Sequence, residues 1–500
     1  MTDTDILIAG AGPTGLMLAL RLAHYGVRFR IIDAKSGPGQ ASRAMVVQAR
    51  TLEFYQQLGL ADKLVQRGIP IDSIHFNENG RDLASLSWGD AGKDITPYPF
   101  VLSFPQDDHE HFLVEQLGML GVSVEWGVRL KSFAEDNDSV NITLEENGTE
   151  SSCQARYLCS CEGARSAVRK QLDIGFPGGT YNQLFYVADV ALEGAPSNNA
   201  YLNAGKHNLV FMAPVRSSGM RRLIGVVPPE LEGKEELVFE DLRPSAESLL
   251  GITVGNANWL STYRVHHRVA EHFRVGRAFL LGDAGHLHSP AGGQGMNTGM
   301  GDAVNLAWKL ADVVQGRAPE PLLDSYETER IAFARKLVET TDKAFEGMVG
   351  EGWRSAFLRN WMLPHLAPAL SHLNVFRRSL FETLSQTRIK YRDSALSDGH
   401  AGELHGGDRM PWSGDNFAHA SSMLWHLQIY GEVSVEFASE AKKLGLPIET
   451  FALTKHAERS GLKMNAAYLV RPDTHVALVL KEQDSGALSS FMRRIGLTLI

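Results

Sequence analysis

The first thirty residues alternate between apolar runs and polar turns. Residues 5–10, DILIAG, form a short apolar run typical of a β-strand. A Gly-rich turn follows, and apolar residues then recur at helical spacing from Leu16 to Ala23. A second apolar run, residues 27–32, ends at Asp33. This order predicts a βαβ unit and therefore an α/β fold.

Later parts of the chain carry further strand and helix patterns. Residues 184–192, 208–213 and 223–227 are strand-like and predict a second sheet. An apolar run at 278–281 precedes a Gly-rich turn and a helix expected to begin near Met296. Near the C-terminus, residues 467–471 and 475–480 predict a hairpin, followed by an amphipathic helix.

Length and charge narrow the class of protein. A chain of 500 residues is too long for one hydrophobic core, so we expect two or three domains. Hydrophobic residues make up 44% of it and charged residues 21%, which is typical of a globular protein. The net charge of −9 comes from intermixed signs without a long basic run, so we expect no nucleic-acid partner.

The compartment is predicted from what the sequence lacks. The apolar start, residues 6–20, follows two aspartates and contains Gly-Pro, which favours internal structure over a signal peptide. No uninterrupted apolar run reaches about 18 residues, so no membrane span is predicted. The three cysteines are Cys153, Cys159 and Cys161. Their odd number and spacing predict neither a disulfide framework nor a zinc site, and we expect a cytoplasmic protein.

The first turn has the sequence Gly10-Ala11-Gly12-Pro13-Thr14-Gly15. In such a GxGxxG turn the first glycine permits the tight turn, the second lets the backbone approach a pyrophosphate, and the third allows close helix packing. The helix N-terminus favours an anion, and Asp33 can accept hydrogen bonds from a ribose diol. The sequence predicts dinucleotide binding here, but the turn does not distinguish NAD from FAD, because both contain an ADP half.

A second motif, residues 282–297, reads GDAGHLHSPAGGQGMN. Asp283 lies at a strand end, where its carboxylate can hold a sugar-like chain. The glycines Gly292, Gly293 and Gly295 then lead into a helix. A helix N-terminus at this point can stabilise the negative charge that develops on reduced flavin. This motif therefore favours FAD.

Together, GxGxxG and GDAxHxxxPxxGxGMNxGxxDAxNLxWKL (residues 282–310) resemble the class A flavoprotein aromatic hydroxylases, the para-hydroxybenzoate and phenol hydroxylase group. The resemblance implies that Asp283 contacts the ribityl chain of FAD. It also implies that the segment from Pro290 to Asn297 passes along the isoalloxazine ring. Within that segment the cofactor-binding candidates are Pro290, Gly293, Gly295, Met296 and Asn297.

A third family motif, DGxxSxVR, occurs here as residues 162–169 with Glu162 in place of the usual aspartate. In relatives this segment is linked with FAD and NAD(P)H binding, so Gly163 becomes a cofactor-binding candidate, while the role of the longer Glu162 stays open. The same resemblance implies FAD contacts for Arg43 and Gln106. Without it, an arginine and a glutamine are ordinary surface residues.

The resemblance also implies a reaction. In this family NAD(P)H reduces FAD, O2 adds at flavin C4a, and the resulting hydroperoxide transfers OH to an electron-rich ring. The protein must position the substrate and exclude water. Tyr263 is the best polar catalytic candidate, although a core tyrosine with a satisfied hydroxyl explains it equally. The backbone of Pro290 is expected at the flavin edge. The predicted substrate lining is Tyr181, Phe211, Met212, Tyr263 and Ala291.

The resemblance covers residues 1 to about 345 and implies a discontinuous Rossmann-like FAD-binding domain, residues 1–75, 106–180 and 264–345. A β-sheet substrate domain fills the gaps, residues 76–105 and 181–263. A helical connector, 346–400, and a thioredoxin-like C-terminal domain, 401–500, follow. That last domain has no cysteine, so it cannot perform dithiol exchange. The family further implies a possible homodimer.

Several alternatives remain open at this point. His286 and His288 have metal-like spacing, but no cluster of further ligands completes a site, and we assign no metal. A flavin halogenase would show WxWxIP, which is absent. An FAD-dependent reductase, or a non-catalytic FAD-binding protein, would share the flavin motifs. The sequence does not choose the aromatic ring, the position hydroxylated, or NADH against NADPH.

Overall fold

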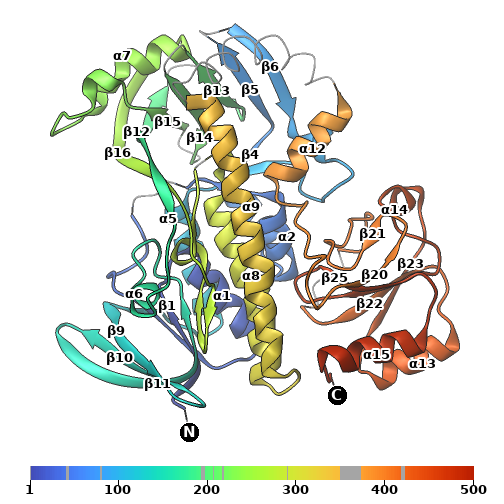
Figure 1. Cartoon of the computed structure of the whole chain (residues 1–500). Coiled ribbons are helices and arrows are strands. Elements are labelled where there is room, and N and C mark those ends of the chain that lie inside the picture. The colour runs from blue at the N-terminus through green and yellow to red at the C-terminus, as the bar shows by residue number, and fades with distance from the viewer. Residues whose placement is uncertain are drawn as a thin grey trace.

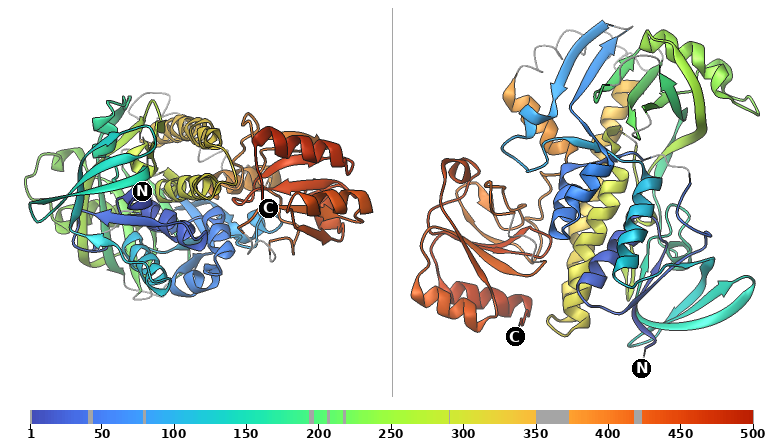
Figure 2. Two further views of the ribbon diagram at one scale, coloured as in Figure 1. Left: turned by 90° about the horizontal axis from the view of Figure 1, so that it is seen from below. Right: turned by 180° about the vertical axis from the view of Figure 1, so that it is seen from behind.

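The computed structural model describes residues 2–40, 44–78, 81–192, 197–205, 208–216, 219–289, 291–349, 373–417 and 423–499. The chain forms an N-terminal α/β body, a sheet domain that covers one end of it, and a C-terminal domain at its side (Figure 1). Two long helices, α8 (Gly295–Val314) and α9 (Asp324–Val349), run through the middle. The C-terminal domain stays on one side of these helices in every view (Figure 2).

The first body is built around a sheet with the order β17-β18-β11-β1-β2-β8, which is parallel except between β17 and β18. β1 (Thr4–Ala9) pairs in parallel with β2 (Phe29–Asp33) and β11 (Thr149–Ser160), and β11 pairs in parallel with β18 (Ala278–Leu280). The remaining strands are β8 (Glu125–Trp126), β9 (Val128–Glu135), β10 (Val140–Glu146) and β17 (Arg274–Val275). The predicted βαβ unit is confirmed, with α1 (Pro13–His24) between β1 and β2.

Helices cover this sheet because its strands are apolar on both faces. α1 packs against α5 (Gln106–Met119) and α8. The short elements are α2 (Ala49–Gln57), α3 (Ala61–Arg67), α4 (Trp88–Gly92), α6 (Ala167–Gln171), η2 (Gly282–Ala284), η3 (Ala291–Gly293), η4 (Glu320–Leu323) and the small sheet of β3 (Val46–Val47), β7 (Val101–Ser103) and β4 (Ile69–Ile71). In the described part of the chain, no helix is long and apolar enough to cross a membrane.

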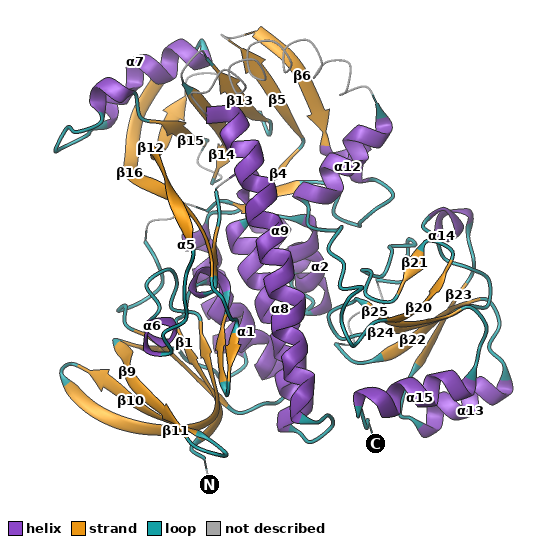
Figure 3. Cartoon of the chain, viewed as in Figure 1, coloured by secondary structure: helices purple, strands orange, loops and turns teal. Residues whose placement is uncertain are grey.

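The second sheet has the order β19-β16-β12-β15-β14-β13-β5-β6 and is antiparallel except between β13 and β5. Its strands are β5 (Ser73–Glu78), β6 (Arg81–Ser87), β12 (Gly178–Leu192), β13 (Ala200–Ala204), β14 (Leu209–Val215), β15 (Met220–Val226), β16 (Val254–Val269) and β19 (His286–Leu287). One face packs against α7 (Phe239–Leu250), which follows η1 (Pro229–Leu231). Figure 3 shows this sheet above the central helices.

The long strands differ from the predicted domain limits. β12 begins at Gly178 and β16 ends at Val269, so the predicted limits at 180/181 and 263/264 fall inside strands. β19 belongs to the second sheet although it lies within the predicted segment 264–345. A strand of about fifteen residues is long enough to extend across two bodies. The chain therefore crosses between them without a loop.

The C-terminal domain has the sheet order β21-β20-β25-β24-β22-β23. Its elements are β20 (Asp398–Ala401), β21 (Leu404–His405), β22 (His426–Tyr430), α13 (Val435–Lys443), β23 (Ile448–Phe451), α14 (Lys455–Arg459), β24 (Ala467–Val470), β25 (Val476–Leu480) and α15 (Ser485–Ile495). From β22 onward the order β-α-β-α-β-β-α fits the thioredoxin-like domain that the resemblance implies. The predicted hairpin is β24–β25, which is antiparallel.

The predicted helical connector, 346–400, is only partly described. α9 continues to Val349, residues 350–372 lie outside the described residues, and α12 (Asn374–Leu384) follows. After α12 the connector has no further helix among its described residues and reaches β20 at Asp398. Of its described part, α12 packs against α4.

His109, on α5, provides a test of what stabilises the core around that helix. Its ring is fully buried, Tyr55 donates to Nε2 at 2.5 Å, and burial lowers the pKa of His109 to about 3. The unfolded chain takes up this proton near pH 6.5, so stability falls as the pH drops from 6.5 toward 3. We predict that wild type loses about 1 kcal/mol more than His109→Gln between pH 6 and pH 5, measured as urea unfolding. Parallel pH profiles for the two proteins would contradict this.

Candidate active site

The GxGxxG turn is closed by two glycines that have no room for a side chain. Gly10 has φ of +106°, and a Cβ there would overlap the carbonyl of Cys161 at the end of β11. A Cβ on Gly15 would overlap the carbonyl of Gly10. α1 therefore leaves β1 at a sharp angle and points its N-terminus along the end of the sheet. These two roles agree with the sequence prediction.

The middle glycine differs from the other two, because it faces open space. No atom lies within 4 Å of a Cβ built on Gly12, and the N-terminus of α1 has no side-chain cap. The backbone N–H groups of this turn are thus available to an anion. Asp33 lies beside the turn at the end of β2, where it accepts hydrogen bonds from Ala11 N at 2.7 Å and Lys35 N at 2.8 Å.

Thr14 joins the first motif to the second. It lies between Gly282 and Gly299, and a Cβ on Gly282 would come 2.7 Å from Thr14 Oγ1. A Cβ on Gly299 would overlap the same hydroxyl oxygen. The start of α1 and the start of α8 therefore lie side by side, although they are far apart in the sequence. Two helix N-termini point into one region, which favours a ligand with more than one negative group.

Asn297 fixes the turn before α8. Its side chain is fully buried; Oδ1 accepts hydrogen bonds from Gln48 N at 2.9 Å and Thr51 Oγ1 at 2.8 Å, and Nδ2 donates to Val46 O at 3.0 Å and Gly293 O at 2.9 Å. Four bonds from one amide hold the turn against β3 and α2. Of its predicted neighbours, Gly295 is the first residue of α8 and Met296 packs against the main core.

The third motif supports the second. Glu162 Oε2 accepts hydrogen bonds from Ser160 Oγ and Ser166 Oγ at 3.0 Å each and from Val168 N at 3.2 Å, so the glutamate holds the start of α6. Arg169 then donates to the carbonyl of Ala284 at 2.7 Å. Gly163 has φ of +78°, and a Cβ there would meet nothing within 4 Å. In this chain the glutamate itself therefore fixes the local structure of the motif.

Several predicted cofactor residues can be placed. Asp283 is exposed at the end of β18, close to the first motif through Gly282. Gln106 begins α5, receives no side-chain cap, and donates from Nε2 to Glu110 at 2.8 Å and from its backbone N to Ala44 O at 3.0 Å. Arg43 and Pro290 lie outside the described residues, and so does the side chain of Ala291.

The strand register places Tyr263 and Phe211 on one face of the second sheet and Met212 on the other. Tyr263 pairs with Phe185 across β16 and β12, with ring centroids 5.9 Å apart, and Tyr181 packs in the same apolar cluster. Phe211 packs against a cluster that contains Val46, which touches Gly293 before α8. Phe211 therefore faces the second motif.

Met212 does not join them. It follows Phe211 on β14, so its side chain points to the other face and packs with Leu223 and Leu242 beneath α7. The alternation of a β-strand separates the two neighbours, and the run of apolar residues in β14 concealed it because both faces of this strand are covered. We leave Met212 out of the proposed lining.

Residues 3–341 match a family model whose description is FAD binding domain. The chain belongs to this FAD-binding family. 6-Methylpretetramide 4-monooxygenase from Streptomyces rimosus is 39% identical over 414 residues, 80% of this chain and 72% of that protein. Pentachlorophenol 4-monooxygenase from Sphingobium chlorophenolicum is 32% identical over 362 residues, covering 70% and 66%. The structure of aklavinone-11 hydroxylase with FAD and aklavinone has a TM-score of 0.82 at 25% identity, covering 99% of each chain.

These comparisons confirm FAD over NAD for the first motif, the predicted α/β fold with an FAD-binding domain, and the class of FAD-dependent aromatic monooxygenases. The thioredoxin-like nature of the C-terminal domain stays a prediction. The residues of this flavoprotein also fit the cofactor. Gly12 leaves room for a pyrophosphate at the start of α1. Around the loop before α8, four buried polar atoms have no hydrogen-bond partner among the described residues: Gln48 Oε1, His286 Nδ1, His288 Nε2 and Ser289 Oγ. A bound polar ring system would satisfy such atoms.

His286 and His288 have metal-like spacing in the sequence, but they do not form a metal site in the described part of the chain. His286 Nε2 bonds to Asp302 at 2.7 Å, and burial lowers the pKa of His288 to about 4, so His288 is neutral near pH 7. Among the described residues no group of three or more His, Cys, Asp or Glu side chains could hold a metal ion. The sequence predicted Pro13 and Thr14 as cofactor-binding residues, but it did not indicate that Thr14 and Gln48 contact this loop, because those contacts are made only in the folded chain.

The glycines of the first turn provide a matched pair of variants. We predict that Gly15→Ala lowers the stability of the apoprotein by roughly 2–4 kcal/mol, because its Cβ overlaps a backbone carbonyl that cannot move away. Gly12→Ala should change that stability by less than about 1 kcal/mol, yet weaken FAD binding about tenfold or more, because its methyl group enters the open space beside α1. Thermal unfolding of the apoprotein and titration with FAD measure the two effects. Tight FAD binding by Gly12→Ala would contradict the assignment.

Proposed function

We propose that this flavoprotein hydroxylates an electron-rich aromatic ring of the phenol type, using NAD(P)H and O2. One observation carries the proposal: the FAD motifs converge at the start of α8, and the second sheet turns an aromatic face toward that point. Phe211 packs against the apolar cluster that contains Val46, Val46 lies beside Gly293, and α9 contacts both η3 and β16. Relatives that are 39% and 32% identical to this chain are named as monooxygenases.

Bound FAD supplies the redox chemistry with NAD(P)H and O2. The chain itself binds the cofactor, places the ring beside it and keeps water away. Phe185, Tyr181 and Tyr263 form an apolar cluster with Val226 and Val265 that suits a flat aromatic substrate. We propose that Phe211 and Ala291 complete this lining and that the backbone of Pro290 lies at the flavin edge.

Tyr263 is the proposed polar group for the substrate. Tyr263, on β16, lies opposite Phe185, and the rest of this strand leads back to the FAD motifs. This position supports the role. Tyr181 is a second candidate, since its hydroxyl donates to Asp342 on α9 at 2.6 Å. A phenol oxygen bound by either tyrosine would be held in one orientation relative to the cofactor.

The substrate class that we propose is a phenolic fused-ring polyketide. The relative with 39% identity is named for 6-methylpretetramide, and the structure with TM-score 0.82 contains aklavinone. The alternative is a reductase on the same scaffold, which would use FAD and NAD(P)H without transferring oxygen. We also propose a cytoplasmic homodimer; the free, buried state of all three cysteines supports a reducing compartment, and the family resemblance supports the dimer.

The direct test is NAD(P)H oxidation by the FAD-loaded protein against a panel of simple phenols, hydroxypyridines and fused-ring polyketides. The proposal expects one fused-ring phenol to stimulate oxidation strongly and to yield a product one oxygen heavier. Stimulation by simple phenols alone would reject the polyketide class but retain the hydroxylase. Oxidation that no aromatic compound stimulates would favour the reductase.

Phe211 and Met212 allow a matched test of the proposed lining. We predict that Phe211→Ala raises the KM for the aromatic substrate about tenfold, because a large apolar side chain that faces the flavin region is lost. Met212→Leu should leave KM within about twofold, because Met212 points to the opposite face beneath α7. Steady-state kinetics with the stimulating compound measures both. Equal effects of the two substitutions would contradict this assignment of faces.

A further inference from the structure

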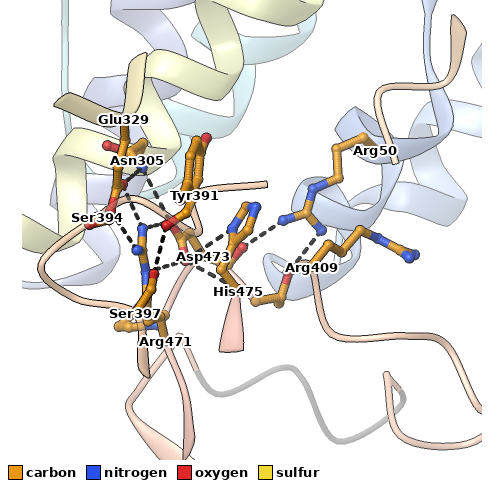
Figure 4. Close-up of polar contacts among 12 residues, drawn as sticks. Arg50, Asn305, Glu329, Tyr391, Ser394, Ser397, Arg409, Arg471, Asp473 and His475 are labelled. Carbon is orange, nitrogen blue, oxygen red and sulfur yellow. Dashed lines mark hydrogen bonds and ion pairs between the residues drawn. The ribbon is translucent and has the colours of Figure 1, made fainter. Parts of the chain in front are cut away.

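The turn of the β24–β25 hairpin is buried against the flavoprotein body. Arg471 lies at its start, fully buried, and pairs with both carboxylate oxygens of Glu329 on α9 at 2.7 and 2.9 Å (Figure 4). The same guanidinium bonds to Asp473 at 2.6 Å. Bidentate pairing gives a fixed geometry as well as attraction, so the turn and α9 are locked together.

Glu329 is the centre of this cluster. It also accepts hydrogen bonds from Lys309 at 2.8 Å, Asn305 at 2.6 Å and Ser394 at 2.7 Å. Burial alone would raise the pKa of Glu329, but Arg471 and Lys309 lower it well below its usual value. The carboxylate is therefore charged, and removing a partner would leave an uncompensated buried charge.

The next residue of α9 carries the connection toward FAD. Arg330 donates from Nε to Asp302 at 2.5 Å and from a terminal nitrogen to Thr298 O at 3.0 Å, in the first turns of α8. The other oxygen of Asp302 accepts from Gly282 N at 2.9 Å and from His286 at 2.7 Å. Asp302 therefore holds the loop that carries Asp283.

A second connection runs through α2. Arg50 donates to Asp473 O and to Thr474 Oγ1, both at 2.7 Å (Figure 4). The next residue, Thr51, donates to Asn297, which holds the turn before α8. The hairpin turn thus contacts both elements that position the start of α8, and it does so from the far side of the FAD motifs.

Two residues of this region have a left-handed backbone. Thr474 has φ of +62°, which is rare for a β-branched residue, and the buried Gln386 has φ of +59°. Gln386 donates to Thr298 Oγ1 at 2.9 Å in the first turn of α8. A conformation of this kind persists only where surrounding contacts fix it, and such residues gather at functional sites.

We propose that the turn Arg471–Thr474 is a positioning element of the FAD site. Among the described residues, the turn meets α8 only beyond its first turns, where Asp473 accepts a hydrogen bond from Asn305 at 3.4 Å. It acts on the flavin loop through Glu329 and Arg330 on α9 and through Arg50 on α2. These contacts set the position of the Gly282–Asp283 loop and of the α8 N-terminus. The inference rests on FAD binding by the family and is independent of which ring is hydroxylated.

Arg471→Lys in the full chain tests this, because it keeps the charge but loses the bidentate geometry. The matched control is Trp425→Phe, in the same domain interface. Trp425 donates to Asp312 at 3.1 Å, ten residues along α8 from Asp302, and phenylalanine keeps a ring against Trp308. The measurements are the FAD dissociation constant by fluorescence quenching, the midpoint potential of bound FAD, and thermal unfolding of each apoprotein.

The proposal expects Arg471→Lys to raise the FAD dissociation constant about tenfold and to lower the midpoint potential, while Trp425→Phe changes the dissociation constant less than about twofold. Equal effects at matched apoprotein stability, or none from Arg471→Lys, would overturn it. If Arg471→Lys fails to fold, Thr474→Gly replaces it. That substitution removes the strained side chain and one of the two acceptors that the turn offers Arg50, and unchanged FAD binding by that variant would overturn the proposal as well. Failure to bind FAD in the wild type would instead reject the underlying function.

Discussion

The close packing of Thr14 against Gly282 and Gly299 is the contact on which the site depends. It leaves no space for a side chain at either glycine, so the first turn of α1 can sit directly on the loop before α8. Two helix N-termini then point into one region, and their unpaired N–H groups favour the negative charge of a dinucleotide and of a reduced flavin ring. Any residue larger than glycine at these positions would separate the two motifs.

A second constraint keeps that packing in place. The body contains buried carboxylates, Asp302 and Glu329, each of which is satisfied by an arginine and by further donors. Burying such charges is costly unless every partner is present, so the arrangement has one geometry rather than several. In this chain the partners come from α8, α9 and the C-terminal hairpin. The C-terminal domain is thereby continuous with the core of the flavoprotein, although the sequence separates them by more than a hundred residues.

The local parts of this structure were predictable from the sequence. The βαβ unit, the start of α8 and the β24–β25 hairpin follow from short-range periodicity and glycine spacing, and the family resemblance supplied the discontinuous domain order. The predicted limits of the substrate domain were less accurate, because β12 and β16 are long enough to cross between two bodies. Met212 shows a related difficulty, since both faces of β14 are apolar and the sequence gives no sign of which face a residue takes.

The ionic contacts could not be predicted, because their partners meet only after folding. Arg471 and Glu329 lie 142 positions apart, and each alone is an ordinary charged residue in a sequence where most such residues are exposed. The role of Glu162 was left open for a similar reason, and its three donors explain it once α6 is in place. The sequence motifs therefore predict least about long-range polar contacts of this kind.

The central claim is that this FAD-dependent protein places an oxygen atom from O2 on an aromatic ring. The most direct measurement is a single turnover with 18O2, in which FAD-loaded protein reduced by NAD(P)H without oxygen is mixed with the aromatic compound that stimulates it best. Mass spectrometry then follows the product. The account predicts a product that carries one 18O atom and loses the label when 16O2 is used with 18O-labelled water. A product without the label, or reoxidation that yields only hydrogen peroxide, would contradict it.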